Sequence, residues 1–155
     1  MGTPGFAVAS LKHLHGTGMN IVGVVTAPDR PSGRGKNLTP PPVKIFAEQE
    51  LNCPIFQPEK LRDPEFIEQL EKLHAHLFIV VAFRMLPELV WSIPSHGTIN
   101  LHASFLPDYR GAAPINWAII NGEERTGIST FLIDQAIDTG RILKRKSLPI
   151  SPVET

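Results

Sequence analysis

The sequence predicts an α/β domain with a mostly parallel sheet and helices on both faces. Short apolar, β-branched runs alternate with segments of helical periodicity along the chain. The 155 residues suit one domain with a substantial core, because 42% of them are hydrophobic and only 19% are charged. Ligands of such folds bind at the carboxyl ends of the strands, so residues that follow strands are the first candidates for a site.

Each expected element is a stretch of one periodicity bounded by turn residues. A helix begins after Pro4 and ends near Gly16, since its apolar residues lie three or four apart. We expect further helices at 43–50, 64–73, 87–92 and 114–121, and strands at 21–26, 55–56, 77–83, 97–102, 127–133 and 142–148. Residues 28–42 contain five prolines and two glycines, and we expect no regular element there. Trp91 and Trp117 are interpreted as helix residues that anchor the core.

The start of the chain departs from the usual order of an α/β unit. A tight turn that opens a helix normally follows a strand, because a βαβ unit begins with its strand. Here the turn stands at residues 2–5. We therefore expect that the first strand of the sheet is lacking and that the domain is incomplete.

Charge and cysteine content narrow the classes of function. Fifteen basic residues balance fifteen acidic ones, so nucleic acid could be held only by a local basic patch. The single cysteine excludes an internal disulfide, and the longest apolar run, 77–83, is too short to span a membrane. We expect a cytoplasmic protein without membrane contact.

Asn100 and His102 form the first candidate site, at the end of an expected strand. Because side chains alternate along a strand, both lie on the same face. An amide and an imidazole side by side suit an oxygen that becomes negative as a carbonyl is attacked. The same pair would also suit a strand end that caps its own loop, and the spacing does not decide between the two.

Asp138 is the candidate partner of His102. It lies in a loop between two expected strands, followed by Thr139 and Gly140. The carboxylate would either accept hydrogen bonds in its own turn or lie beside His102, where it would favour and orient the charged ring. The sequence leaves both possibilities open.

A basic loop supplies the local patch that the overall charge lacks. Residues 28–36 hold Arg30, Arg34 and Lys36 against one acidic residue, and glycines flank Arg34. Such a run is usually a solvated loop, but a flexible basic loop can also follow a phosphate backbone. The phosphate-binding P-loop pattern is absent, and no group of residues has the spacing of metal ligands.

Three segments carry a family resemblance. The stretch from Asn100 through Pro107 to Ile115 resembles the signature of 10-formyltetrahydrofolate-dependent formyltransferases, and residues 138–140 resemble its distal part. Residues 28–44 are similar to the loop of those members that formylate the charged initiator tRNA. The likeness covers nearly the whole chain, and its motifs agree in order and spacing.

The resemblance implies a Rossmann-like catalytic domain over residues 1–155, with the family's first strand and C-terminal β-barrel domain absent. It implies 10-formyltetrahydrofolate as formyl donor, methionyl initiator tRNA as partner, no metal and a monomer. The implied catalytic residues are Asn100, His102 and Asp138, the implied folate contacts are Ser104, Phe105, Leu106, Pro107, Phe83 and Leu86, and the implied tRNA contacts are Arg30, Arg34 and Lys36.

Two departures and two alternatives accompany this interpretation. Phe105 stands where leucine is usual, and residues 81–87 are one residue shorter than the common version, which affects the expected pterin pocket. One alternative is formyl transfer to a small amine, such as a sugar nucleotide or glycinamide ribonucleotide, which would have no need of the basic loop. The other is a non-catalytic folate-binding remnant.

Overall fold

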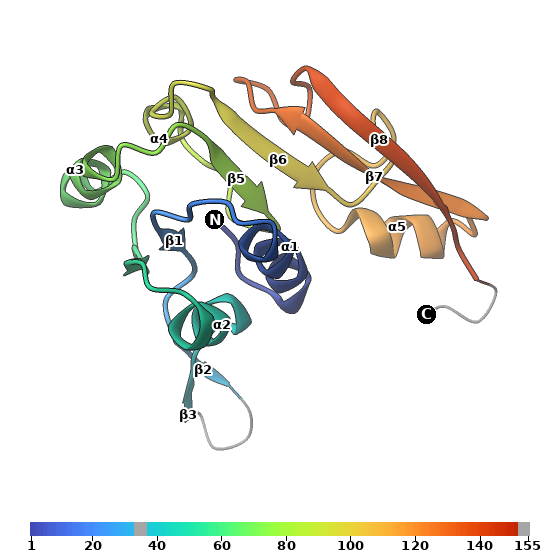
Figure 1. Ribbon diagram of the computed structural model, residues 1–155. Coiled ribbons are helices and arrows are strands. Elements are labelled where there is room, and N and C mark those ends of the chain that lie inside the picture. The colour runs from blue at the N-terminus through green and yellow to red at the C-terminus, as the bar shows by residue number, and fades with distance from the viewer. Residues whose placement is uncertain (33–36, 152–155) are drawn as a thin grey trace.

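Helices and strands alternate along the chain, as the sequence predicts (Figure 1). The computed structural model describes residues 1–32 and 37–151. Its helices are α1 (Gly5–Gly16), α2 (Pro42–Glu50), α3 (Pro64–Lys72), α4 (Glu88–Trp91) and α5 (Pro114–Ile120). Its strands are β1 (Val24–Val25), β2 (Arg30–Ser32), β3 (Asn37–Thr39), β4 (Ile55–Phe56), β5 (Phe78–Val81), β6 (Thr98–His102), β7 (Arg125–Leu132) and β8 (Ile142–Pro149). Strand β5 lies between α1 and the segment that carries α3 and α4 (Figure 1). None of the helices in the described ranges is long and apolar enough to cross a membrane.

The main sheet has the strand order β5-β6-β7-β8. Strands β5 and β6 are parallel, with Val80 opposite Asn100. Strands β6, β7 and β8 are antiparallel to their neighbours, with His102 opposite Ser129 and Ser129 opposite Arg145. The sheet is therefore mixed, and the expected α/β architecture carries an antiparallel edge.

The first two residues join this sheet to the parallel pair β1-β4. The amide of Gly2 donates to the Val25 carbonyl at 3.0 Å, and the amide of Val81 donates to the Met1 carbonyl at 2.9 Å. Met1 and Gly2 thus lie between β1 and β5, at the position where the sequence predicts a missing first strand. Their hydrogen bonds make the two sets of strands continuous.

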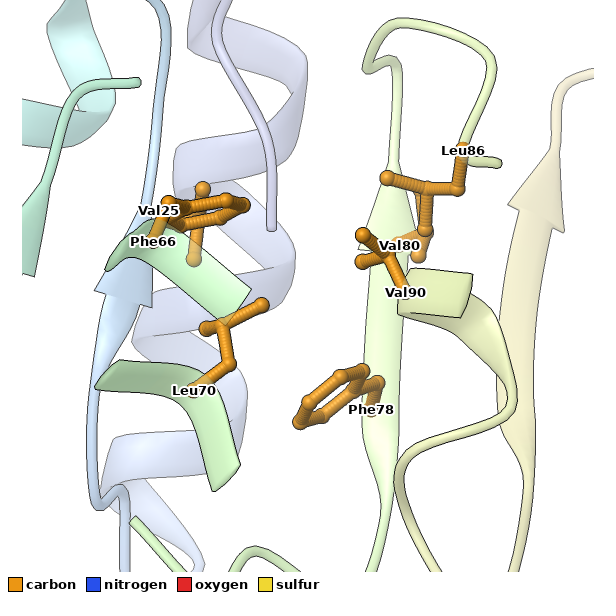
Figure 2. Close-up of a cluster of buried hydrophobic side chains, with 7 residues drawn as sticks. All are labelled: Val25, Phe66, Leu70, Phe78, Val80, Leu86 and Val90. Carbon is orange, nitrogen blue, oxygen red and sulfur yellow. The ribbon is translucent and has the colours of Figure 1, made fainter. Parts of the chain in front are cut away.

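Helices cover both faces of the strands at β1 and β5, as expected. Neighbouring residues of a strand point to opposite faces, so Val24 and Val25 belong to two different apolar clusters. Figure 2 shows the cluster under α3 and α4, which consists of Val25, Phe66, Leu70, Phe78, Val80, Leu86 and Val90. The opposite cluster lies under α1 and α2 and consists of Ala7, Val24, Val43, Ala47 and Val81. Burial of these side chains on both faces fixes the strands between the helices.

Helix α3 illustrates how the sequence sets an element's ends. The Asp63 side chain accepts a hydrogen bond from the Glu65 amide at 3.1 Å, and Pro64 occupies the first turn. Phe66 and Leu70 lie four residues apart and are 4% and 1% exposed. The helix therefore forms where capping and an apolar stripe agree.

The expectation of an irregular segment at 28–42 is wrong. Strands β2 and β3 form a short antiparallel ribbon in which Arg30 pairs with Thr39 and Pro31 pairs with Leu38. Proline is tolerated in such an isolated ribbon, because the N–H that it lacks can be one that faces away from the partner strand. Arg34 and Lys36 lie outside the described residues.

The interpretation of Trp117 is also wrong. Its side chain is 52% exposed on α5, next to Ile120, which is 68% exposed. Helix α5 has seven residues, and Ala118 is the one that it buries. Trp91 instead packs against the cluster under α3 and α4, as expected.

The Asp29 carboxylate fixes the root of the β2-β3 ribbon. Gln57 Nε2 donates to Asp29 Oδ1 at 2.6 Å, and Lys44 Nζ donates to Asp29 Oδ2 at 2.8 Å. These hydrogen bonds, that of Gln57 first, lower the pKa of Asp29 below its ordinary value. The residue before the ribbon is thereby tied to α2 and to the end of β4.

We expect Asp29→Asn to lower the urea midpoint of unfolding at pH 6. Because the pKa of Asp29 is lower in the folded state, its stabilisation is complete above the ordinary value of 3.8 and is lost as the pH falls through the folded value. The difference from wild type should therefore shrink below pH 3.8. Glu50→Gln, at the exposed end of α2, is the control and should leave the midpoint unchanged. A difference that stays constant down to acid pH would contradict this role of Asp29.

Candidate active site

Strand β6 presents Asn100 and His102 on one face of the sheet. Hydrogen-bonded ladders to β5 and β7 fix the strand on both sides. Asn100 is half-buried, and its side-chain amide makes no hydrogen bond within residues 1–32 and 37–151. Both of its N–H groups therefore remain available to a ligand.

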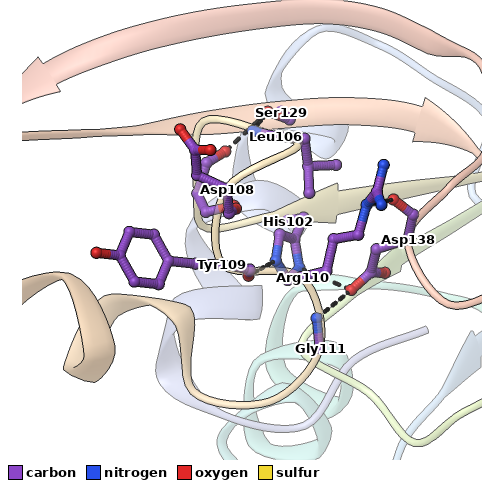
Figure 3. Close-up of polar contacts among 9 residues, drawn as sticks. His102, Leu106, Asp108, Tyr109, Arg110, Gly111, Ser129 and Asp138 are labelled. Atoms are coloured by element: carbon purple, nitrogen blue, oxygen red, sulfur yellow. Dashed lines mark hydrogen bonds and ion pairs between the residues drawn. The ribbon is translucent and has the colours of Figure 1, made fainter.

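The His102 ring lies between two oxygen acceptors and is 7% exposed (Figure 3). Its Nε2 lies 2.8 Å from the Tyr109 carbonyl oxygen. A carbonyl oxygen only accepts, so Nε2 carries a proton. Its Nδ1 lies 3.6 Å from Asp138 Oδ2. The buried ring therefore lies between a hydrogen bond to a backbone carbonyl and a contact with a carboxylate.

Asp138 reaches His102 from the loop between β7 and β8. Its Oδ2 also accepts a hydrogen bond from the Gly111 amide at 2.7 Å, and its carbonyl accepts one from Arg110 Nε at 3.2 Å. The backbone of Asp138 is left-handed, with φ 53°, a conformation that aspartate adopts more readily than most residues. One carboxylate therefore holds both the imidazole and the loop after β6, so the structure brings together His102 and Asp138.

Close packing at Gly140 closes the loop that carries Asp138. A Cβ atom at this position would lie 1.7 Å from the Leu132 carbonyl oxygen, so only glycine fits. Within the loop, Asp134 Oδ1 accepts hydrogen bonds from Thr139 Oγ1 at 2.8 Å and from the Ala136 amide at 3.2 Å. Asp134 therefore accepts hydrogen bonds within this loop, which is one of the two roles that the sequence leaves open for Asp138.

The segment after His102 is fixed mainly by its own buried groups. Ser104 and Leu106 are 0% and 1% exposed. Ser129 Oγ accepts from the Leu106 amide at 3.0 Å and donates to the Ser104 carbonyl at 2.7 Å. The side chains of Ser104 and Leu106 thus shape the segment from within, whereas Phe105 is half-buried and Pro107 is exposed.

The Tyr109 side chain fixes the position of the Tyr109 backbone carbonyl, which accepts the hydrogen bond from His102 Nε2. Its hydroxyl donates to Glu123 Oε1 at 2.6 Å and accepts from Asn121 Nδ2 at 3.1 Å. The hydrogen bond to the Glu123 carboxylate raises the pKa of Tyr109, because it stabilises the protonated phenol. The backbone of Tyr109 is left-handed, with φ 54°. Side-chain bonds to the end of α5 therefore hold a conformation that is costly for tyrosine.

The remaining predicted contacts, Leu86 and Phe83, both adjoin the apolar cluster under α3 and α4. Leu86 is 8% exposed and belongs to the cluster under α3 and α4. Phe83 lines a cavity of about 410 Å³ together with Arg30 and Thr39 of the ribbon and with Thr3. The structure thus groups Phe83 with the root of the basic loop, and it places the Leu86 side chain in the core.

Sequence reasoning missed Tyr109, Gly111 and Ser129. Tyr109 and Gly111 act through backbone atoms, which leave no pattern of side-chain types. Ser129 is 0% exposed in an apolar strand. A small polar residue at an inward position of an expected strand was the one available signal, since buried hydroxyls require partners.

A family model described as formyl transferase matches residues 1–155. Methionyl-tRNA formyltransferase of Bacteroides thetaiotaomicron is 54% identical over 154 residues, which are 99% of this chain and 48% of the relative. The enzyme of the same name from Parabacteroides distasonis is 56% identical over 155 residues, with the same coverage. The chain thus spans about half the length of the curated relatives it matches.

Solved structures give the same fold. Phosphoribosylglycinamide formyltransferase of Anaplasma phagocytophilum matches with a TM-score of 0.78 at 22% identity, over 100% of this chain and 72% of that one. A formyltetrahydrofolate deformylase of Pseudomonas syringae matches with a TM-score of 0.73 at 20% identity, over 99% of this chain and 51% of that one. The Rossmann-like formyltransferase fold is confirmed, and the match of the family model over all 155 residues shows that the chain belongs to the formyl transferase family.

Proposed function

We propose that the protein transfers a formyl group from 10-formyltetrahydrofolate to the α-amine of methionyl initiator tRNA, in translation initiation. The proposal includes a cytoplasmic monomer whose residues 1–155 form the catalytic domain. The observation that carries it is the buried His102 ring, with acceptors at both nitrogens and the free amide of Asn100 on the same strand face. The names of the similar proteins support the choice of tRNA as acceptor.

In the proposed reaction, the amine of the aminoacyl group attacks the formyl carbon. A bond forms between them, and negative charge grows on the formyl oxygen. Asn100 and the charged His102 would donate hydrogen bonds to that oxygen. The bond from the formyl carbon to N10 of the folate then breaks, and the proton that the amine loses passes to N10 through water. Formyl-methionyl-tRNA and tetrahydrofolate are the products.

The Tyr109 carbonyl takes the place of the formyl oxygen at His102 before substrate arrives. To donate to the formyl oxygen, Nε2 must release that carbonyl, to which it now donates at 2.8 Å. Tyr109 and Ala113 both have φ 54°, and a left-handed conformation costs such residues about 1–3 kcal/mol each. This cost favours movement of residues 109–113 once the hydrogen bond between the Tyr109 carbonyl and His102 is exchanged.

The β2-β3 ribbon is the proposed contact with the acceptor arm of the tRNA. Arg30 is exposed, and the root of the ribbon is fixed through Asp29, Lys44 and Gln57. A fixed root would let the basic residues reach the phosphate backbone in a defined direction. Arg34 and Lys36 remain predicted contacts.

We expect Asn100→Ala and His102→Ala each to lower the rate of transfer by about 10²–10³-fold, the usual effect of removing one oxyanion donor. The assay measures formylation of charged initiator tRNA by the full-length protein. Asn116→Ala and His96→Ala, which remove exposed side chains outside the site, are the matched controls. Near wild-type rates for both site variants would refute their roles.

Asp138→Asn should lower the rate of transfer while the fold persists. The asparagine side-chain oxygen can still accept from the Gly111 amide, and asparagine tolerates the left-handed backbone, but the neutral side chain no longer places a negative charge beside the His102 ring. We expect a fall of at least about tenfold, below the roughly 10⁴-fold that a misoriented histidine can cause. Asp134→Asn, in the same loop, is the control, and an equal fall there would assign the effect to the loop's shape.

Arg34→Ala and Arg30→Ala should raise the KM for charged initiator tRNA and leave the KM for the folate unchanged. Each lost phosphate contact should also reduce the salt slope of tRNA binding by about one. Arg62→Ala, an exposed arginine ahead of α3, is the control. Uncharged and elongator tRNA and glycinamide ribonucleotide are the comparison acceptors. Preferred transfer to glycinamide ribonucleotide, unaffected by the arginine variants, would replace the proposal with the small-amine alternative.

A further inference from the structure

We propose that Arg145 on β8 is a positioning residue that clamps the segment after His102 and so preforms its folate contact. The inference rests on the proposed function, because it takes Phe105 and Pro107 as contacts of the folate. It assigns a role in binding to a residue of strand β8, which lies outside the segments that carry the family resemblance.

Arg145 contacts the segment after His102 through two different interactions. Its guanidinium carbon lies 4.8 Å from the centre of the Phe105 ring. Its Nη1 donates to the Leu106 carbonyl at 2.8 Å. A planar guanidinium can stack on a ring and hydrogen-bond to the next carbonyl at the same time, which the point charge of lysine does less well.

The Phe105 side chain also lies against strand β7. A Cβ atom at Gly127 would lie 2.9 Å from Phe105 Cδ2 and 3.0 Å from Phe105 Cβ. Phe105 is therefore in contact with both the backbone at Gly127 and the guanidinium of Arg145. An aromatic ring offers a face for this arrangement, whereas the leucine that is usual at this position does not.

The register of the sheet places Arg145 in line with Ser129 and His102 across three neighbouring strands. Arg145 is paired with Ser129, and Ser129 is paired with His102. Ser129 binds the segment through the Leu106 amide, and Arg145 binds it through the Leu106 carbonyl. Both backbone groups of Leu106, four residues after the end of β6 at His102, are thus held by neighbouring positions of two strands.

This arrangement bears on binding because a loop that is ordered beforehand loses less conformational entropy when a ligand arrives. Arg145 itself is exposed and lies outside the apolar core clusters. Its removal should therefore loosen the segment 103–109 and spare the core. The expected signature is weaker folate binding with little change in the rate of the bound complex.

The test measures binding of 5-formyltetrahydrofolate to the full-length protein by calorimetry, together with transfer kinetics. Arg145→Gln should raise the folate Kd and KM by about tenfold, within the range of a lost cation-π contact and a lost charged hydrogen bond, with kcat changed less than about threefold. Arg145→Lys should restore part of the loss. Lys144→Gln and Lys146→Gln are the matched controls, because adjacent strand residues point to the opposite face.

A second measurement separates this inference from the proposed function. Hydrogen exchange of residues 103–109 should become faster in Arg145→Gln and stay at the wild-type rate in the lysine controls, whichever substrate the protein uses. In Phe105→Leu, the further effect of Arg145→Gln on folate Kd should be smaller than in wild type. Equal folate Kd and equal exchange in Arg145→Gln and the controls would overturn the inference, whereas a wild-type protein that binds no folate would overturn the proposed function first.

Discussion

The position of one imidazole between two oxygen acceptors governs the arrangement of the site. The His102 ring is nearly buried, and a buried N–H without a partner costs free energy, so both acceptors must be held in place. Asp138 comes from the β7-β8 loop, and the Tyr109 carbonyl comes from the segment after β6. Close packing at Gly140 fixes the first acceptor, and hydrogen bonds to the end of α5 fix the second. Two loops that are far apart in sequence are thus shaped around a single ring.

Local patterns predicted the elements and half of the site. The period of two along a strand was enough to place Asn100 and His102 on one face, and the apolar runs located the strands. Asp138 comes near His102 because β7 runs antiparallel to β6 and β8 runs antiparallel to β7. The number of residues between His102 and Asp138 does not predict this arrangement. The β2-β3 ribbon was missed because prolines and glycines usually mark irregular segments, while three paired residues are enough for a small ribbon. Trp117 was misplaced because aromatic residues are more often buried than exposed.

A motif also does not separate side chains that touch a ligand from those that shape a loop. Ser104 and Leu106 belong to the stretch that the resemblance assigns to folate contact, yet both are buried and point into the protein. Their backbone groups are bound by Ser129, a residue outside that stretch. Such residues shape the backbone of the segment from inside the protein, and the sequence alone does not distinguish this from direct contact with a ligand.

Strand β8 is the outermost strand of the four-stranded sheet. An outer strand offers unpaired backbone groups to any other extended chain, and proteins commonly guard it with positive charge or proline. Lys144, Arg145 and Lys146 place three adjacent cations on this strand, and Pro149 removes one N–H near its end. Two copies brought edge to edge would set like charges against each other. The composition of this strand therefore protects the sheet against aggregation as well as completing its edge.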